Sequence, residues 1–299
     1  MRRVSITDVG MRDGLQMESQ VLTTDEKVAI ADLLIAAGVR RIEATSFVSP
    51  RAVPQLADAH ELIGRLRGKN ATFSAMVPNA SGARRAVAAG VERIRFFLSV
   101  SETHNQRNVN RSVVQSLENA AEVIDIARSA GVGADMAIAT SFGCPFEGDI
   151  DPAKVVAIAE RCAQLGFDAV ALADTTGMAT PRIVERLCDA MRVALPKLPI
   201  ALHFHNTRGL GLVNVMVGLE QGIERFESSL GGLGGCPFAP GASGNISTED
   251  LVHMMDELGI DTGIDLPRLI VAAQRLEAIL GKVLPGQVMK AGPRLALHS

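Results

Sequence analysis

Short apolar runs alternate with longer amphipathic segments along the 299 residues of the chain. The short runs predict strands, and the segments with apolar residues at every third or fourth position predict helices. A glycine follows most of the helical segments, as is typical of helix ends. The predicted strands are residues 4–9, 41–45, 72–77, 93–100, 133–139, 169–174, 200–205 and 225–229. The predicted helices are residues 25–37, 53–66, 81–89, 112–130, 152–165, 181–195, 210–221 and 248–258.

The regular alternation of strands with helices predicts an α/β fold with parallel strands. Eight such units within about 260 residues match a (β/α)8 TIM barrel. One more helical pattern, at residues 266–280, precedes a polar tail. We therefore predict a single catalytic TIM-barrel domain over residues 1–299, with the barrel at about 4–260 and a C-terminal helical segment at about 264–299. An open doubly wound sheet is the alternative, but no G-x-G-x-x-G turn follows the first strand.

Composition and charge exclude several classes of function. The 30 Lys and Arg residues balance 33 Asp and Glu residues and form no basic block, so we expect no nucleic-acid partner. The chain has no apolar stretch of the roughly 18 residues that a membrane span requires, and no signal-peptide core at its start. Its four cysteines form no C-x-x-C pair, which is typical of free thiols in a reducing compartment. We therefore expect a cytoplasmic protein that does not bind membranes.

Polar residues at the ends of predicted strands carry the candidate chemistry, because a TIM-barrel active site lies at the C-terminal ends of the strands. Asp13 follows the first strand, Glu43 lies within the second, and Asp174 ends the sixth. His203 and His205 are two residues apart on the seventh strand, so their rings point to the same side. This spacing, with an acidic residue expected nearby, favours metal ligation over a pair of ordinary buried histidines.

Closure of the barrel would bring these residues together. The eighth strand would neighbour both the seventh and the first, so we expect Asp13, the histidine pair and the loop that ends at Asn245 to converge. The acidic residues of the second and sixth strands would flank that point. An ion pair between Glu43 and Arg40 or Arg41 is the alternative, although alternation along the strand is expected to turn Arg41 away from Glu43.

Cys236 lies in a loop that has six glycines between residues 231 and 244. A lone cysteine is ordinarily an inert thiol. The glycines, however, leave the backbone few restraints, which favours a mobile loop close to the substrate. Cys236 is therefore a candidate for a reactive group.

At these positions the sequence resembles the hydroxymethylglutaryl-CoA lyase family, a group of metal-dependent TIM-barrel lyases. The resemblance extends over essentially the whole chain and rests on four motifs. They are R-D-G-L-Q at residues 12–16, E-A-T-S-F-V-S-P at residues 43–50, H-F-H at residues 203–205, and G-G-L-G-G-C-P-F-A-P-G-A-S-G-N at residues 231–245. The last motif continues into T-E-D at residues 248–250, a length that makes a chance match implausible.

The resemblance implies a metal site and assigns roles to individual residues. Two imidazoles with a carboxylate and an amide oxygen favour Mg²⁺ or Mn²⁺, with Co²⁺ or Zn²⁺ as substitutes. The implied metal ligands are Asp13, His203, His205 and Asn245. The implied catalytic residues are Arg12, Glu43, Asp174, Cys236 and His203, and the implied substrate contacts are Arg12, Gln16 and Ser46.

The implied reaction is carbon–carbon cleavage of a 3-hydroxy-3-methylacyl-CoA, with hydroxymethylglutaryl-CoA giving acetyl-CoA and acetoacetate. This reaction belongs to leucine degradation and ketone-body formation. Arg12 would stabilise the enolate of acetyl-CoA and Cys236 would protonate it, whereas the acceptor of the hydroxyl proton stays open between His203, Asp174 and Glu43. The implied partners are the acyl-CoA substrate and a second copy of the chain in a homodimer.

Four departures from the family pattern leave the acyl group open. Met11, Met17, Ser19 and Asn206 stand where the family commonly has proline, asparagine, lysine and aspartate. Since they change the rim of the site, a citramalyl-CoA lyase that gives acetyl-CoA and pyruvate is the alternative. Two further alternatives are a paralogue that binds metal or CoA without catalysis and a synthase that forms the bond. The intact catalytic residues argue against the paralogue, and the short chain after the eighth unit argues against the synthase.

Overall fold

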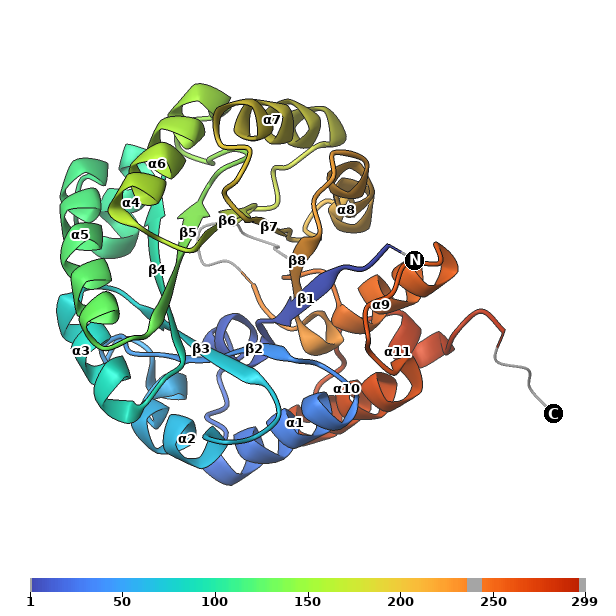
Figure 1. The fold of residues 1–299 in the computed structure, drawn as a ribbon. Helices are drawn as coiled ribbons and strands as arrows, with labels where there is room; N and C mark the ends of the chain where they lie inside the picture. Colours follow the sequence, from blue (N-terminus) through green and yellow to red (C-terminus); the bar gives the residue numbers. More distant parts are fainter. Residues whose placement is uncertain (1, 236–243, 296–299) are drawn as a thin grey trace.

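A closed barrel of parallel strands forms the centre of the protein, which we describe over residues 2–235 and 244–295 of a computed structural model (Figure 1). The strands follow one another around the barrel in sequence order, and β8 pairs with β1 from Ser5 opposite Arg225 to Asp8 opposite Ser228. This closure confirms the predicted TIM barrel and excludes the open sheet. The strands are β1 (Ser5–Asp8), β2 (Arg41–Ser46), β3 (Thr72–Val77), β4 (Arg93–Ser99), β5 (Gly133–Ala139), β6 (Ala169–Ala173), β7 (Ile200–His203) and β8 (Arg225–Ser228).

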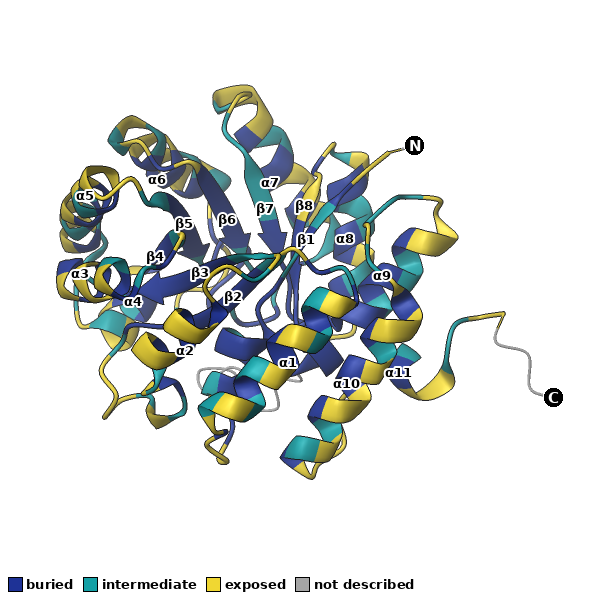
Figure 2. Ribbon diagram, turned by 60° about the horizontal axis from the view of Figure 1, so that its bottom comes forward, coloured by how far each residue is buried: buried dark blue, intermediate teal, exposed yellow. Residues whose placement is uncertain are grey.

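Helices surround the barrel, with their buried faces towards the strands and their exposed faces towards solvent (Figures 1 and 2). In the described part of the chain, no helix has both the length and the apolar character needed to cross a bilayer. The α-helices are α1 (Thr24–Ala36), α2 (Ala59–Leu66), α3 (Ala80–Ala89), α4 (Glu102–Val109), α5 (Val113–Ser129), α6 (Pro152–Leu165), α7 (Pro181–Ala194), α8 (Gly211–Glu220), α9 (Thr248–Glu257), α10 (Leu266–Leu280) and α11 (Val288–Ala291). Three short helical turns are η1 (Gly10–Gly14), η2 (Pro54–Leu56) and η3 (Leu230–Gly232).

Two helical segments differ from the prediction. The predicted helix at residues 53–66 is interrupted between η2 and α2, where the Asp58 carboxylate accepts a hydrogen bond from Nζ of Lys27 (2.5 Å) instead of capping α2. Helix α4 was not predicted, because its sequence E-T-H-N-Q-R-N-V has no apolar stripe. Its start is stabilised by Ser101, whose hydroxyl accepts from the backbone N–H of His104 (3.0 Å).

The side chains inside the barrel are largely charged or small. On β4, Arg93 and Arg95 point inward and form ion pairs, whereas Ile94, Phe96 and Leu98 alternate with them and are buried on the outer side. The hydrophobic core therefore lies between the strands and the helices, and the barrel encloses a polar compartment. Alanines of three strands line that compartment and keep it open: Ala137, Ala139, Ala169, Ala171, Ala173 and Ala201.

Helix α10 packs beside α1 on the outside of the barrel (Figures 1 and 2). The backbone N–H of Asp265 donates to the carbonyl of Ala37 (2.7 Å), and the guanidinium of Arg268 donates to the carbonyl of Ala36 (3.1 Å). These bonds satisfy carbonyls that the end of α1 leaves free. The predicted helix at residues 266–280 is confirmed.

Candidate active site

Arg12 and Asp13 reach the mouth of the barrel through η1, the turn directly after β1. The carbonyl of Val9 accepts backbone hydrogen bonds from Arg12 (3.1 Å) and Asp13 (2.7 Å), so the chain folds back over the end of its own strand. Below the turn, the Asp8 carboxylate accepts from the N–H of Gly10 (2.9 Å). Burial raises the pKa of Asp8 to about 6, although its hydrogen bonds oppose the shift. Asp8 therefore shapes the turn that carries the two site residues.

The two histidines meet at the end of β7. His203 ends the strand, and His205 pairs with Asn245 in an isolated antiparallel bridge, so the regular strand is two residues shorter than predicted. The Nε2 atoms of the two rings are 3.1 Å apart. Nδ1 of His203 lies 3.2 Å from Oε2 of Glu227 on β8, and we assign the ring proton to this hydrogen bond. Nε2 of His203 therefore carries a lone pair that faces His205.

These residues fit a divalent cation. One ligand atom each from Asp13, His203 and His205 lies within 4.8 Å of the others. Oδ2 of Asp13 is 3.8 Å from Nε2 of His205 and accepts from Nδ2 of Asn245 at 2.8 Å. Oδ1 of Asn245 is buried and has no hydrogen-bond partner among the described residues, which is costly unless a positive group binds there. Two imidazoles, a carboxylate and an unpaired amide oxygen form a donor set of the kind that Mg²⁺, Mn²⁺ and related ions accept.

The surroundings of Asp13 and His205 favour the protonation states that bind a metal ion, which are a charged carboxylate and a neutral imidazole. Burial opposes the charged form of Asp13, but Arg12 and the two imidazoles outweigh it and hold the pKa of Asp13 well below its usual range. Burial and the neighbouring His203 lower the pKa of His205 to about 4, so this ring is neutral near pH 7. For His203, the hydrogen bond to Glu227 and the charge of Asp13 outweigh burial and raise the pKa, so an ion would compete with a proton there.

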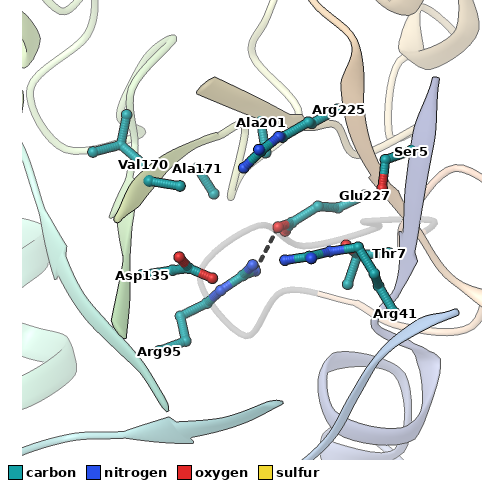
Figure 3. A pocket seen from close by; sticks show the side chains of 11 residues that line it. Ser5, Thr7, Arg41, Arg95, Asp135, Val170, Ala171, Ala201, Arg225 and Glu227 are labelled. Carbon is teal, nitrogen blue, oxygen red and sulfur yellow. Dashed lines mark ion pairs between the residues drawn. The ribbon is translucent and has the colours of Figure 1, made fainter. Parts of the chain in front are cut away.

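Glu43 is fully buried and pairs with arginines from other parts of the barrel. Nε of Arg12 contacts its Oε1, and Nη1 of Arg95 lies 3.0 Å from its Oε2. The alternative ion pair with Arg40 or Arg41 is not formed. The expectation that Arg41 turns away was also wrong, because residues 41 and 43 are two apart and share one face, and the Arg41 side chain points into the barrel (Figure 3).

Arg95 and Glu227 belong to the site and were not predicted. They face each other inside the barrel, with Nη1 of Arg95 2.5 Å from Oε1 of Glu227 (Figure 3). Since Glu227 also contacts His203 and Glu43 also contacts Arg12, Arg95 links the two sides of the site. The sequence does carry a signal for both: charged residues at alternate positions of short apolar strands, in R-I-R-F-F-L and R-F-E-S, mark side chains that point into a barrel.

A cavity of about 450 Å³ opens beside these residues, which is within the range of small-molecule sites. The predicted site residues that line it are Arg12, Asp13, Gln16, His203 and His205. Those that are buried and do not line it are Glu43, Ser46, Asp174 and Asn245. The cavity therefore gathers three of the four candidate cation ligands and Arg12, while the predicted substrate contact Ser46 is buried and does not line it.

Asp174 lies next to the histidines with one oxygen free. Its Oδ1 accepts backbone hydrogen bonds from Met178 (2.7 Å) and Ala179 (2.9 Å), and its own N–H donates to the carbonyl of His203 (2.9 Å). Its Oδ2 is buried and has no hydrogen-bond partner among the described residues. Burial outweighs the hydrogen bonds and raises the pKa of Asp174 to about 7. Asp174 can therefore exchange a proton near neutral pH.

Glycines close the base of the loop that contains Cys236. A Cβ atom on Gly234, whose φ is 140°, would lie 2.5 Å from Nδ2 of Asn245, and a Cβ atom on Gly244 would lie 2.5 Å from the carbonyl oxygen of Gly234. The two glycines therefore leave room for the Asn245 amide, whose Nδ2 donates to Asp13 (2.8 Å) and to the carbonyl of Leu233 (3.1 Å). Cys236 itself lies outside the described residues, but the preceding Gly235 lines the cavity.

Comparison with known proteins gives consistent matches over the whole chain. The sequence model of the HMGL-like family matches residues 3–276. The (R)-citramalyl-CoA lyase of Chloroflexus aurantiacus is 44% identical over 98% of this chain and 96% of that protein. The hydroxymethylglutaryl-CoA lyase of Bacillus subtilis is 40% identical over 96% of both chains. A solved structure from Acinetobacter baumannii, described as an HMG-CoA lyase in complex with coenzyme A and 3-methylmalate, has a TM-score of 0.94 at 44% identity and covers 99% of this chain and 97% of that chain.

Proposed function

Because this chain belongs to the HMGL-like family and is a carbon–carbon lyase, we propose that it cleaves hydroxymethylglutaryl-CoA to acetyl-CoA and acetoacetate. One observation carries the proposal: Arg12 and three of the four candidate cation ligands, Asp13, His203 and His205, line one cavity of about 450 Å³. A cation and a fixed guanidinium side by side suit a substrate that carries a hydroxyl, a carboxylate and a thioester.

Asp13, His203, His205 and Asn245 would hold a Mg²⁺ or Mn²⁺ ion. When bound, the divalent cation would polarise the tertiary hydroxyl and the carboxylate of the substrate and lower the pKa of that hydroxyl. Chelation of the metal should therefore abolish cleavage, and added Mg²⁺ or Mn²⁺ should restore it. Full activity in a preparation shown to be metal-free would contradict this part of the proposal.

The remaining steps belong to side chains of the protein. The tertiary hydroxyl loses its proton and becomes a ketone, and the electron pair of the broken carbon–carbon bond moves to the acetyl-CoA fragment as an enolate. The guanidinium of Arg12, which lines the cavity, would stabilise the enolate oxygen. Cys236 would then donate its proton to the enolate carbon, giving acetyl-CoA, and would regain a proton from solvent.

Asp174 is the acceptor that we propose for the hydroxyl proton. His203 has Nδ1 in the hydrogen bond to Glu227 and Nε2 among the proposed cation ligands. Both oxygens of Glu43 contact arginines, whereas Oδ2 of Asp174 has no hydrogen-bond partner and no ion pair with an arginine or lysine among the described residues. Asp174 does not line the cavity. The proposal therefore requires that, when the substrate binds, Oδ2 of Asp174 comes within hydrogen-bond distance of the substrate hydroxyl. Asp174→Asn, which keeps the size of the side chain and an acceptor oxygen, should lower kcat by about 10²–10⁴-fold.

Citramalyl-CoA is the second candidate substrate, favoured by the 44% identity to the Chloroflexus enzyme against 40% to the Bacillus one. The two acyl groups differ by one methylene between the tertiary carbon and the carboxylate, and a methylene is worth about 10–200-fold in kcat/KM. We expect the higher kcat/KM with hydroxymethylglutaryl-CoA, measured as release of acetoacetate against pyruvate. The opposite ratio would make the protein a citramalyl-CoA lyase, and cleavage of neither would contradict both assignments.

A homodimer in the cytoplasm completes the proposal. The family resemblance supports the dimer, and light scattering during size-exclusion chromatography should give twice the 31.6 kDa of the chain. The three cysteines within the described residues, Cys144, Cys162 and Cys188, are free and buried, which supports a reducing compartment.

A further inference from the structure

We infer that Arg95 is a positioning residue for the metal site: it fixes the Glu227 carboxylate, and Glu227 in turn orients His203. The inference rests on the proposed function, because His203 is one of the proposed cation ligands. Arg95 lies on β4, and its guanidinium is aimed at Glu227 (Figure 3), whose other oxygen contacts that histidine. Arg95 also lines the cavity, but its effect on the metal site would pass through Glu227.

A single nitrogen of Arg95 holds two buried carboxylates. Nη1 lies 2.5 Å from Oε1 of Glu227 and 3.0 Å from Oε2 of Glu43. Arg95 is 5% exposed, Glu227 3% and Glu43 0%, so water screens none of the three charges well. Without the guanidinium, the two buried carboxylates would repel each other and turn apart. Arg95 thus determines where the Glu227 carboxylate lies.

Glu227 divides its two oxygens between Arg95 and the metal site. While Oε1 contacts Arg95, Oε2 lies 3.2 Å from Nδ1 of His203, and this hydrogen bond sets which way the imidazole faces. A carboxylate behind a histidine ligand commonly fixes the tautomer and the direction of the ring, and its loss costs about 10–100-fold in metal affinity. If Glu227 turns away, Nε2 of His203 is no longer held towards His205 and Asp13.

The direction in which metal affinity changes distinguishes two possible roles of Arg95: positioning His203 through Glu227, or acting only as a nearby positive charge. A guanidinium near a cation site repels the cation, so removal of the charge alone would tighten metal binding. Removal of a positioning residue would weaken metal binding, because His203 loses its fixed direction. The two roles of Arg95 therefore predict opposite changes in the dissociation constant of the metal.

Titration of metal-stripped enzyme with Mn²⁺, followed by the electron paramagnetic resonance signal of the free ion, measures this constant without turnover. Arg95→Met should weaken Mn²⁺ binding by about tenfold, the lower end of the range for such outer partners. Arg95→Lys, which can place one charged nitrogen between both carboxylates, should restore the affinity to within about threefold of wild type. In a Glu227→Gln background, Arg95→Met should have a smaller effect, because both substitutions disturb the same contact between residue 227 and His203.

Arg93→Met is the matched control. Arg93 lies on the same strand and face, and pairs with Asp135 (2.6 Å) and Asp168 (2.7 Å) rather than with the site. It should lower thermal stability and leave Mn²⁺ affinity unchanged. Unchanged or tighter Mn²⁺ binding in a folded Arg95→Met protein would overturn the inference, and Arg95→Gln replaces that variant, with the same expectation, if it does not fold. A wild-type protein that binds no Mn²⁺ would overturn the proposed metal site instead.

Discussion

Arg12 is a charged side chain held in place before any substrate arrives. Burial opposes its charge, but Glu43 and Asp13 outweigh burial and raise the pKa of Arg12 above its usual value. The same two carboxylates fix the direction of the guanidinium, which lines the cavity. A cation that is already oriented loses no free energy to reorganisation when negative charge develops beside it. Individual residues of this site therefore act through fixed geometry, and single substitutions should reveal their roles.

Arg12→Met should lower kcat by about 10²–10³-fold, the loss typical of one oxyanion-stabilising group. The measurement is a comparison of kcat and KM with hydroxymethylglutaryl-CoA at saturating Mg²⁺. An effect confined to KM would instead make Arg12 a residue that binds the substrate equally in the ground state and in the transition state.

Cys236→Ala should lower kcat by about 10²–10⁴-fold if the thiol protonates the enolate. Metal affinity and folding should not change, since neither depends on that thiol. Cys188→Ala is a suitable control, because Cys188 is buried on α7 and burial raises its pKa to about 12. Near-normal kcat in Cys236→Ala would leave the loop cysteine without a role in proton transfer.

Glu249 makes stability depend on pH. It is buried on α9, its Oε2 accepts from the N–H of Gly231 (3.0 Å), and burial raises its pKa to about 7. The folded state therefore holds the proton more tightly than the unfolded chain. The resulting stabilisation is fully present below the unfolded pKa of 4.5 and is lost as the pH rises through 7.

Glu249→Gln keeps the acceptor oxygen and removes the titration. Relative to wild type, the variant should gain up to about 3 kcal/mol in free energy of unfolding at pH 8 compared with pH 4.5. Urea unfolding at the two pH values measures this difference. The same offset from wild type at both pH values would show that the buried carboxyl does not titrate between them.

Helices and strands with a regular pattern of hydrophobic residues could be predicted from the sequence, whereas most contacts between elements distant in sequence could not. Strand β3 and helix α6 match their predicted bounds to the residue, because a short apolar run marks the strand and Asp151 and Gly166 cap the helix. The convergence of Asp13 with the histidines also followed from barrel closure alone. The partners of Glu43 did not, because Arg95 lies on another strand and its depth in the barrel is set by register and strand tilt.

The close contact of Gly234 with Asn245, at the start of the loop that contains Cys236, can be tested by substitution. Gly234→Ala would push a methyl group against Nδ2 of Asn245, so we expect weaker Mn²⁺ binding as well as lower stability. Gly259→Ala is the control: its φ of 68° is also positive, but a Cβ atom there would meet nothing within 4 Å. Equal Mn²⁺ affinity in both variants would mean that Asn245 tolerates the displacement.

The whole molecule should be stabilised by the metal, since the proposed ligands come from three separate parts of the chain and are assembled only in the folded state. At an ion concentration 100 times the dissociation constant, binding to the folded state alone adds about 2.7 kcal/mol. The melting temperature should therefore rise with Mn²⁺ or Mg²⁺ and fall on chelation. Tm values that do not respond to either ion would contradict a metal site of useful affinity.

The charged interior of the barrel also bears on how the chain is synthesised and folds. A nascent chain that has passed β4 already contains Glu43 and Arg95, but Glu227 follows only with the last strand. Until that strand leaves the ribosome, Arg95 has Glu43 but not Glu227 as a partner, so a closed half of the barrel would bury this guanidinium with one of its two ion pairs missing. The order of synthesis therefore disfavours a stable half-barrel intermediate. It favours a single late collapse, in which the eighth strand completes the charge pairing and the ring of strands in one event.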